Sequence, residues 1–217
     1  MIETTVAQLT TTWKSVYEDK AFMRKFNITL GVCMVVYLTA ANFLVMNKGR
    51  SGMLLSDPIQ PFIQPRDLSH FIFFFTYLAV AAFLFHIIAQ PQIMQKAFIG
   101  FTAIFIVRTL MIFVLPLAPP EGIVPLHDPV VDMFVMGRAS DLRNDLFFSG
   151  HISDLSFFIF CTTNKNVRNF LIFSAVIVGI MLVAQRVHYT ADVLAAPFFA
   201  YWGYKVFVED KESSFAI

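Results

Sequence analysis

The stretch FIFFFTYLAVAAFLFHIIAQ, residues Phe71–Gln90, decides the kind of fold, because all twenty positions lack Asp, Glu, Lys and Arg. A helix needs about 20 mostly apolar residues to cross the hydrocarbon core of a bilayer. The segment Asn27–Met46 has the same character. Both segments therefore predict helices that span a membrane.

The composition of the whole 217-residue chain supports this prediction. Hydrophobic residues make up 57% of the chain, charged residues only 14%, and Phe alone fills 26 positions. Soluble domains usually carry about 25% charged residues, and a soluble protein of this size could not bury so much apolar surface. The net charge of +1 gives no electrostatic basis for binding nucleic acid. Cys33 and Cys161 lie in apolar runs and form no disulfide framework.

Four more apolar segments bring the expected number of spans to six, which predicts an all-α, polytopic six-helix bundle. These segments are Ala97–Leu117, Leu146–Cys161, Phe170–Ala184 and His188–Phe207. The two long connections, Asn47–His70 and Ala118–Asp145, are rich in Pro and Asp and are expected to be loops.

The distribution of Lys and Arg predicts the orientation, since cytoplasmic loops carry an excess of both. With the N-terminus in the cytoplasm, nine of these residues lie inside, six lie outside, and Arg108 lies within a span. This orientation places Arg108, Asp145, His151, His188 and Asp192 toward the outer side.

Ionisable residues inside spans are costly unless they are paired or line a cavity, so each is a candidate for function. Arg108 lies beyond the middle of the third predicted span, His151 and Asp154 begin the fourth, and His188 and Asp192 open the sixth. A buried structural ion pair would explain any one of these five ionisable residues. It does not explain why all five lie toward the same side of the membrane.

The spacing of these residues indicates a chemistry. His188 and Asp192 are four apart, so on a helix they share a face, and the carboxylate would orient the imidazole as a nucleophile or base. Ser149 is a favoured N-cap, and Gly150 would let a ligand approach the backbone. The helix start then favours a phosphate, with His151 beside it as general acid. Arg108 would bind the phosphate oxygens in a bidentate manner.

Two segments, Asp145-Leu146-Phe147-Phe148-Ser149-Gly150-His151 and His188-Tyr189-Thr190-Ala191-Asp192-Val193, resemble the signature motifs of the sphingomyelin synthase family. That family is a branch of the type 2 phosphatidic acid phosphatase superfamily. Arg108-Thr109-Leu110 through Leu115-Pro116 resembles the motif of the family's third span. The family has Cys-Gly where this chain has Arg143-Asn144, and Thr where it has Ile152.

The resemblance implies a two-step reaction without a metal or other cofactor. His188, oriented by Asp192, would attack the phosphorus of a donor phospholipid, and His151 would protonate the leaving diacylglycerol. A lipid alcohol such as ceramide or diacylglycerol would then accept the head group from the phosphohistidine. Asp145, Ser149, Gly150, Arg108 and Arg186 are the candidate substrate-binding residues, and Asp154 is a candidate support for His151.

Two other functions stay open at the level of the sequence. A lipid phosphate phosphatase would use water as acceptor, but such enzymes typically carry a Lys separated by six residues from Arg-Pro, and Ser-Arg where this chain has Met181 and Leu182. A nearly dianionic phosphomonoester calls for several cationic contacts, whereas a singly charged phosphodiester calls for fewer. The small number of cations near these motifs therefore favours a phosphodiester. A transporter or channel would need polar residues at mid-depth in several spans.

The expected organisation has three parts. Residues 1–26 are a cytoplasmic segment, either an interfacial helix or a solvated tail, residues 27–207 are a six-helix transmembrane catalytic domain, and residues 208–217 are a cytoplasmic tail. We expect an integral membrane protein whose site faces away from the cytoplasm, in the bacterial inner membrane or in the Golgi, ER or plasma membrane of a eukaryote. Its partners are the donor phospholipid, the acceptor and membrane lipids, and homo-oligomerisation is left open.

Overall fold

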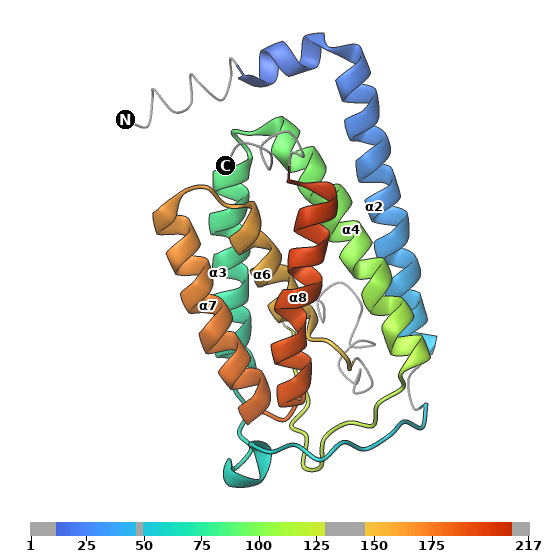
Figure 1. The fold of residues 1–217 in the computed structure, drawn as a ribbon, viewed down its shortest axis with the longest axis vertical. Coiled ribbons are helices and arrows are strands. Elements are labelled where there is room, and N and C mark those ends of the chain that lie inside the picture. Colours follow the sequence, from blue (N-terminus) through green and yellow to red (C-terminus); the bar gives the residue numbers. More distant parts are fainter. Residues whose placement is uncertain (1–11, 47–49, 129–145, 210–217) are drawn as a thin grey trace.

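The computed structural model describes residues 12–46, 50–128 and 146–209, and the regular elements within these ranges are helices. Long helices run roughly side by side along the length of the molecule (Figure 1). They are α2 (Lys20–Met46), α3 (Ser69–Ile87), α4 (Pro91–Val114), α6 (Gly150–Cys161), α7 (Lys165–Ala184) and α8 (Thr190–Phe207), with a short 3-10 helix, η1 (Gln60–Phe62).

Each of the six predicted spans contains one of these helices, but the prediction of six membrane crossings is confirmed only in part. Among the described residues, α2, α3, α4 and α7 are long and apolar enough to cross a membrane. These helices indicate an integral membrane protein. Helix α6 has 12 residues and therefore a length of about 18 Å, well short of the roughly 30 Å of a hydrocarbon core. Helix α8 has 18 residues but includes Asp192 and Lys205.

Several helices begin at residues that the apolar runs did not predict, because local caps set the boundaries. Helix α7 starts five residues before the predicted Phe170, since the Asn164 side chain accepts hydrogen bonds from the Asn166 and Val167 amides. Helix α4 starts at Pro91 instead of Ala97, and proline suits the first helical turn because it lacks an N–H. Helix α2 begins at Lys20, seven residues before the predicted Asn27.

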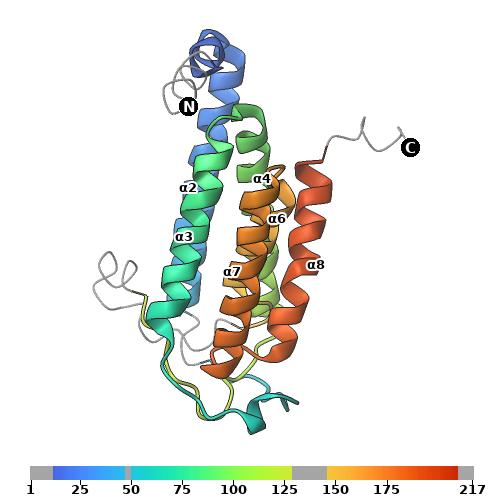
Figure 2. The ribbon, with the colours of Figure 1, turned by 90° about the vertical axis from the view of Figure 1, so that its left-hand side faces the viewer.

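Helix α6 lies at the centre of the bundle and packs against α3, α4, α7 and α8 (Figures 1 and 2). Its side chains at Ile152, Leu155 and Phe157 are almost completely buried. Phe158 stacks on Phe83 of α3, with ring centroids 4.2 Å apart. A short helix can therefore stay within the bilayer, because its neighbours and not the lipid surround it.

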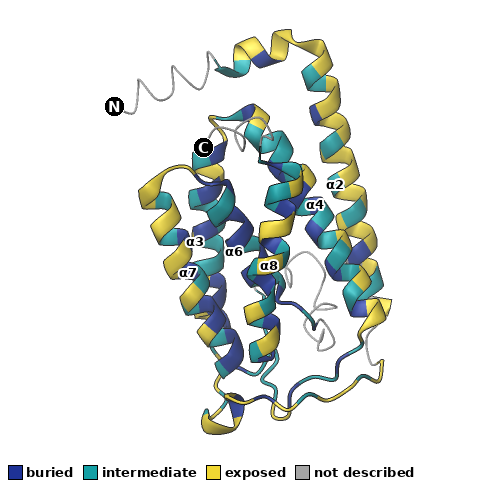
Figure 3. Ribbon diagram, viewed as in Figure 1, coloured by how far each residue is buried: buried dark blue, intermediate teal, exposed yellow. Residues whose placement is uncertain are grey.

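Helix α2 lies at the edge of the bundle and packs on α4, with much of its surface exposed (Figure 3). Its main aromatic contact is Tyr37, whose ring stacks on Phe105 at 4.4 Å between centroids. Helices α4 and α8 approach each other at Gly100 and Gly203, where a Cβ on Gly203 would lie 2.6 Å from Ile104. Small residues at a crossing allow the backbones of membrane helices to approach closely.

The segments 50–68 and 115–128 form the loops at the end of the bundle where α3, α6 and α8 begin (Figure 1). They are joined through Met53, whose amide donates to Pro116 O at 2.9 Å and whose carbonyl accepts from the Ala118 amide at 2.9 Å. A Cβ on Gly52 would lie only 2.4 Å from the Leu117 backbone, so glycine is required at this contact.

The N-terminal segment begins with helical residues 12–18, followed by a break at Asp19. The Trp13 indole donates to Ile88 O at 2.8 Å, so this piece lies against the connection between α3 and α4. Residues 1–11 and 210–217 lie outside the described ranges, and the predicted three-part organisation stays a prediction.

Candidate functional site

His188 and Asp192 form a buried pair at the start of α8. Nδ1 of His188 lies 3.4 Å from Oδ2 of Asp192, and the two side chains are 4% and 0% exposed. The two groups are close enough to attract each other, but the imidazole is not aligned for a hydrogen bond with the carboxylate. Catalytic hydrogen bonds are often long before substrate binds and shorten in the reacting complex. The arrangement leaves Nε2 as the nitrogen that faces away from the carboxylate.

The pair forms for a different reason from the predicted one. His188 was expected within the sixth span, on one helical face with Asp192, but α8 begins at Thr190 and His188 precedes its N-cap, Tyr189. Asp192 is the third residue of the helix, and its Oδ2 accepts a hydrogen bond from the Tyr189 amide at 3.1 Å. A carboxylate at this position reaches back toward the cap, and so it meets the residue just before it.

The Ser149-Gly150 step begins α6, as predicted, and it brings the site together with Arg108. Ser149 is the N-cap, yet its side chain makes no capping bond, and its fully buried Oγ has no hydrogen-bond partner among the described residues. Nε of Arg108 donates to Phe148 O at 3.2 Å. A Cβ on Gly150 would lie 3.0 Å from the Arg108 guanidinium carbon. Glycine is therefore needed here for the arginine to lie against the helix start.

A backbone hydrogen bond joins the two halves of the site. The Ser149 amide donates to the carbonyl of Asp192 at 3.0 Å, so the start of α6 is fixed against the first turn of α8. Arg108, 6% exposed, comes from α4. Three helices thus bring a buried cation, a buried hydroxyl and a His–Asp pair to the same end of the bundle.

His151 and Asp154 lie in the first turns of α6 and are partly buried. The His151 ring packs against Phe73 of α3, with centroids 5.7 Å apart. Asp145 and Arg143 lie outside the described residues. The roles predicted for His151, Asp154 and Asp145 remain predictions.

Arg186, a predicted substrate-binding residue, ends α7 and holds the loops. It has a φ of 60° and follows the C-cap Gln185, and the Val187 amide donates to Leu182 O at 3.1 Å. This is a Schellman motif, in which glycine is usual. The guanidinium donates to the backbone carbonyls of Glu121, Gln60 and Ile63 at 2.7 to 3.1 Å. These hydrogen bonds offset the strain of placing the Arg186 backbone in the left-handed helical region.

Asp57 and Gln60 were missed by sequence reasoning, although both contact the segment around His188. Asp57 accepts hydrogen bonds from the Thr190 amide at 2.6 Å and the Thr190 hydroxyl at 3.0 Å. The Gln60 side-chain amide donates to His188 O at 2.9 Å. Nothing in the pattern distinguishes an Asp before a Pro in a polar loop from an ordinary turn residue, so no signal was available.

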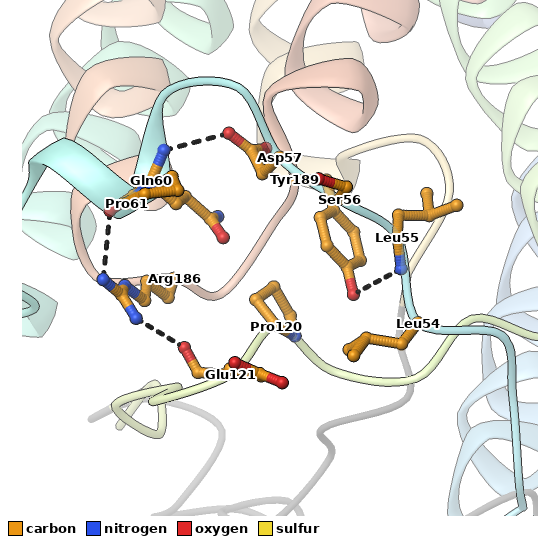
Figure 4. Close-up of a pocket in the computed structure, with 10 residues that line it drawn as sticks. All are labelled: Leu54, Leu55, Ser56, Asp57, Gln60, Pro61, Pro120, Glu121, Arg186 and Tyr189. Carbon is orange, nitrogen blue, oxygen red and sulfur yellow. Dashed lines mark hydrogen bonds between the residues drawn. The ribbon is translucent and has the colours of Figure 1, made fainter.

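These loop residues also line a cavity of about 430 Å³ at the end of the bundle where α8 begins (Figure 4). Its other lining residues are Leu54, Leu55, Ser56, Pro61, Pro120, Glu121, Arg186 and Tyr189. Burial raises the pKa of Asp57, but hydrogen bonds from Thr190, Ile59 and Gln60 outweigh it and leave the pKa below its usual value. Among the residues that the structure describes, no group of three or more His, Cys, Asp or Glu could hold a metal ion.

A comparison with known protein families matches the segment of the chain that contains the His188–Asp192 pair and the start of α6. Residues 144–208, which include the starts of α6 and α8, match the family described as PAP2 superfamily C-terminal. None of the curated proteins compared with the chain matches it. The family match supports membership of the type 2 phosphatidic acid phosphatase superfamily. It therefore indicates an enzyme of lipid metabolism that acts on phospholipid phosphates.

Proposed function

We propose that this protein is a membrane phosphotransferase that moves a phospho head group from a phospholipid to a lipid alcohol such as ceramide or diacylglycerol. The finer assignment, to the sphingomyelin synthase branch, rests on the sequence motifs around His151 and His188. The site would open on the non-cytoplasmic face, as the Lys and Arg distribution predicts.

The observation that carries the proposal is the set of polar groups at the start of α6. The buried Ser149 hydroxyl has no hydrogen-bond partner among the described residues, and it lies at a helix N-terminus beside the Arg108 guanidinium. Helix N-termini bind phosphates through free N–H groups and the helix dipole. The Ser149–Asp192 backbone bond fixes this anion-binding point relative to the start of α8, just after His188.

The proposed reaction has two steps, in which the phosphorus changes partner twice. Nε2 of His188 attacks the phosphorus of the donor, the bond to the diacylglycerol oxygen breaks, and His151 gives that oxygen a proton. The acceptor hydroxyl then loses its proton to His151 and attacks the phosphohistidine, and the phosphorus–nitrogen bond breaks. Asp192 stabilises the imidazolium that forms during each step.

The charge of the site favours a phosphodiester. Arg108 is the only Lys or Arg in the predicted third span, residues 97–117, and no Lys lies in 118–145. Arg186, the next described arginine of the motif region, binds three loop carbonyls. A second negative charge on the phosphate would raise the cost of desolvation, and among the described Lys and Arg residues only Arg108 lies at the start of α6 to offset it.

A groove beside the site suits an acyl chain of the lipid donor. It has a volume of about 520 Å³, is lined mostly by apolar side chains of α6, α7 and α8, and includes the exposed Val176, Ile180 and Leu194. Ile152 and Val193 also line it, and they directly follow His151 and Asp192. A lipid held there would have its phosphate near the start of α6.

The test is a comparison of purified protein on two kinds of phospholipid. Initial rates would be measured on phosphatidic acid and on several diester lipids, with and without ceramide or diacylglycerol, and the products read by mass spectrometry. We expect faster turnover of at least one diester, with its head group appearing on the added alcohol.

Two outcomes would overturn the proposal. Faster release of inorganic phosphate from phosphatidic acid than turnover of every diester would make the protein a lipid phosphate phosphatase, which the superfamily match also accommodates. Head-group transfer that survives in His188→Ala would exclude the phosphohistidine route.

A further inference from the structure

Asp57 is an almost buried carboxylate, 9% exposed, in the loop that joins α2 and α3. All of its described contacts are hydrogen bonds from neighbouring donors. Oδ1 accepts from the Gln60 amide at 3.0 Å (Figure 4). Oδ1 also accepts from the Ile59 amide at 2.9 Å and the Thr190 hydroxyl at 3.0 Å, and Oδ2 accepts from the Thr190 amide at 2.6 Å. It therefore joins the first outer loop to the first residue of α8.

Gln60 continues the same connection to His188. Its backbone amide is bound by Asp57, and its side-chain amide donates to the His188 carbonyl at 2.9 Å. Asp57 and Gln60 together hold the backbone of residues 188–190, which is not yet helical at His188. The position of the imidazole thus depends on a loop more than 120 residues away in the chain.

We propose that Asp57 is a positioning residue for the reaction: it fixes the start of α8 so that the His188 imidazole meets Asp192 and the phosphate in reacting geometry. This inference rests on the proposed role of His188. Charge-assisted hydrogen bonds to a carboxylate are stronger than neutral ones. A displacement of about 1 Å in a reacting group can lower a rate about 100-fold. The lowered pKa of Asp57 keeps the carboxylate ionised at neutral pH.

The alternative is that Asp57 is only a structural cap, and the same loop contains a matched control. Asp67 accepts hydrogen bonds from the Ser69 amide at 3.0 Å and the Ser69 hydroxyl at 2.6 Å, at the start of α3. Its pKa is also lowered, by these two bonds. Asp67 thus makes the same pair of bonds to a helix start, but on a helix that carries none of the proposed reacting groups.

The experiment compares Asp57→Asn with Asp67→Asn in the full-length protein, on the lipid that the wild type turns over fastest. We expect Asp57→Asn to lower kcat by roughly 30-fold or more, with KM within about threefold of wild type, because the reacting geometry changes and the substrate contacts do not. Asp67→Asn should keep kcat within about threefold. Asp57 is buried and accepts four hydrogen bonds, whereas Asp67 is exposed and accepts two, so Asp57→Asn should lose more thermal stability. The comparison of kcat is therefore made at a temperature well below both unfolding midpoints.

Thr190→Val supplies a second variant that removes one of the bonds without touching the charge. It should lower kcat less than Asp57→Asn, and the double variant should be no worse than Asp57→Asn alone, since the two residues act through one contact. Additive effects in the double variant would overturn the proposal. So would equal losses of kcat in Asp57→Asn and Asp67→Asn, which would assign a purely structural role.

A readout without turnover separates this inference from the proposed function. The rate at which diethyl pyrocarbonate modifies His188, followed by peptide mass spectrometry, should change at least threefold in Asp57→Asn and stay near wild type in Asp67→Asn. A wild type that turned over no phospholipid would contradict the proposed function. An unchanged modification rate of His188 in Asp57→Asn would contradict the positioning role, whether or not the wild type is active.

Discussion

At the scale of single residues, Asp192 does two things at once. Its carboxylate accepts from the Tyr189 amide and so caps α8, and it lies 3.4 Å from the His188 ring. Because the capping hydrogen bond holds the carboxylate in place, its negative charge stays next to the His188 imidazole. The residue whose side chain caps α8 is thus also the residue that lies beside the proposed nucleophile.

Removing the proposed nucleophile should stop the reaction completely. We expect His188→Ala to abolish both head-group transfer and donor hydrolysis. Asp192→Asn should lower kcat by roughly 100- to 10,000-fold yet leave measurable turnover, because the amide oxygen can still accept from Tyr189 while the charge is lost. Trapping of a radiolabelled head group on the protein would measure the intermediate. Near-normal labelling in His188→Ala would contradict the prediction.

Arg108→Lys should be damaging although it keeps the charge. The guanidinium lies against Gly150 and donates to Phe148 O, which fixes it beside the start of α6, and a planar guanidinium can donate to two phosphate oxygens at once. A lysine is a point charge and cannot supply both donors. We expect kcat/KM to fall about 10- to 100-fold, on the order of a lost charged hydrogen bond. Arg50→Lys, in an exposed loop, is the control and should have no effect on kcat/KM.

At the scale of helices, the close approach of α4 and α8 at Gly203 positions Arg108 relative to the site. Gly203→Ala would place a Cβ 2.6 Å from Ile104 and should destabilise the protein by about 1–3 kcal/mol through overpacking. Gly31→Ala is the matched control, because nothing lies within 4 Å of its added Cβ. Thermal unfolding in detergent would measure both variants. Equal midpoints for the two would show that the helices do not pack closely at Gly203.

The groove between α6, α7 and α8 predicts a dependence on acyl chain length. Val176→Trp would fill part of the groove, so kcat/KM for a long-chain diester should fall about 10-fold while a short-chain analogue is affected much less. Leu78→Trp, at an exposed position of α3, is the control. Equal losses on long-chain and short-chain lipids in Val176→Trp would assign the acyl chain to another surface.

At the scale of the whole molecule, the site and the loops around it lie at one end of the bundle, and the predicted orientation places that end outside. In a variant with Cys33 and Cys161 replaced by Ala, a membrane-impermeant maleimide should label Glu121→Cys in intact cells. Lys165→Cys, at the exposed first residue of α7, should be labelled only after the membrane is opened. The reverse pattern would show that the site faces the cytoplasm.

The sequence by itself determined the helical class, the positions of the six helices with starts up to seven residues off, and the segments that contain the candidate site. These features follow from apolar runs and from local spacing, which act over a few neighbouring residues. The same reasoning placed Ser149 at a helix start and paired His188 with Asp192, although it put His188 inside the helix.

Only the tertiary structure decided which groups share the site and which hold it in place. Arg108 meets Gly150, Ser149 meets Asp192, and Asp57 meets Thr190 across 40 to more than 130 residues of chain. Arg186, predicted to bind substrate, binds three loop carbonyls. Such contacts depend on how helices pack and where loops cross, and a hydrogen bond between distant residues leaves no periodic pattern in a single sequence.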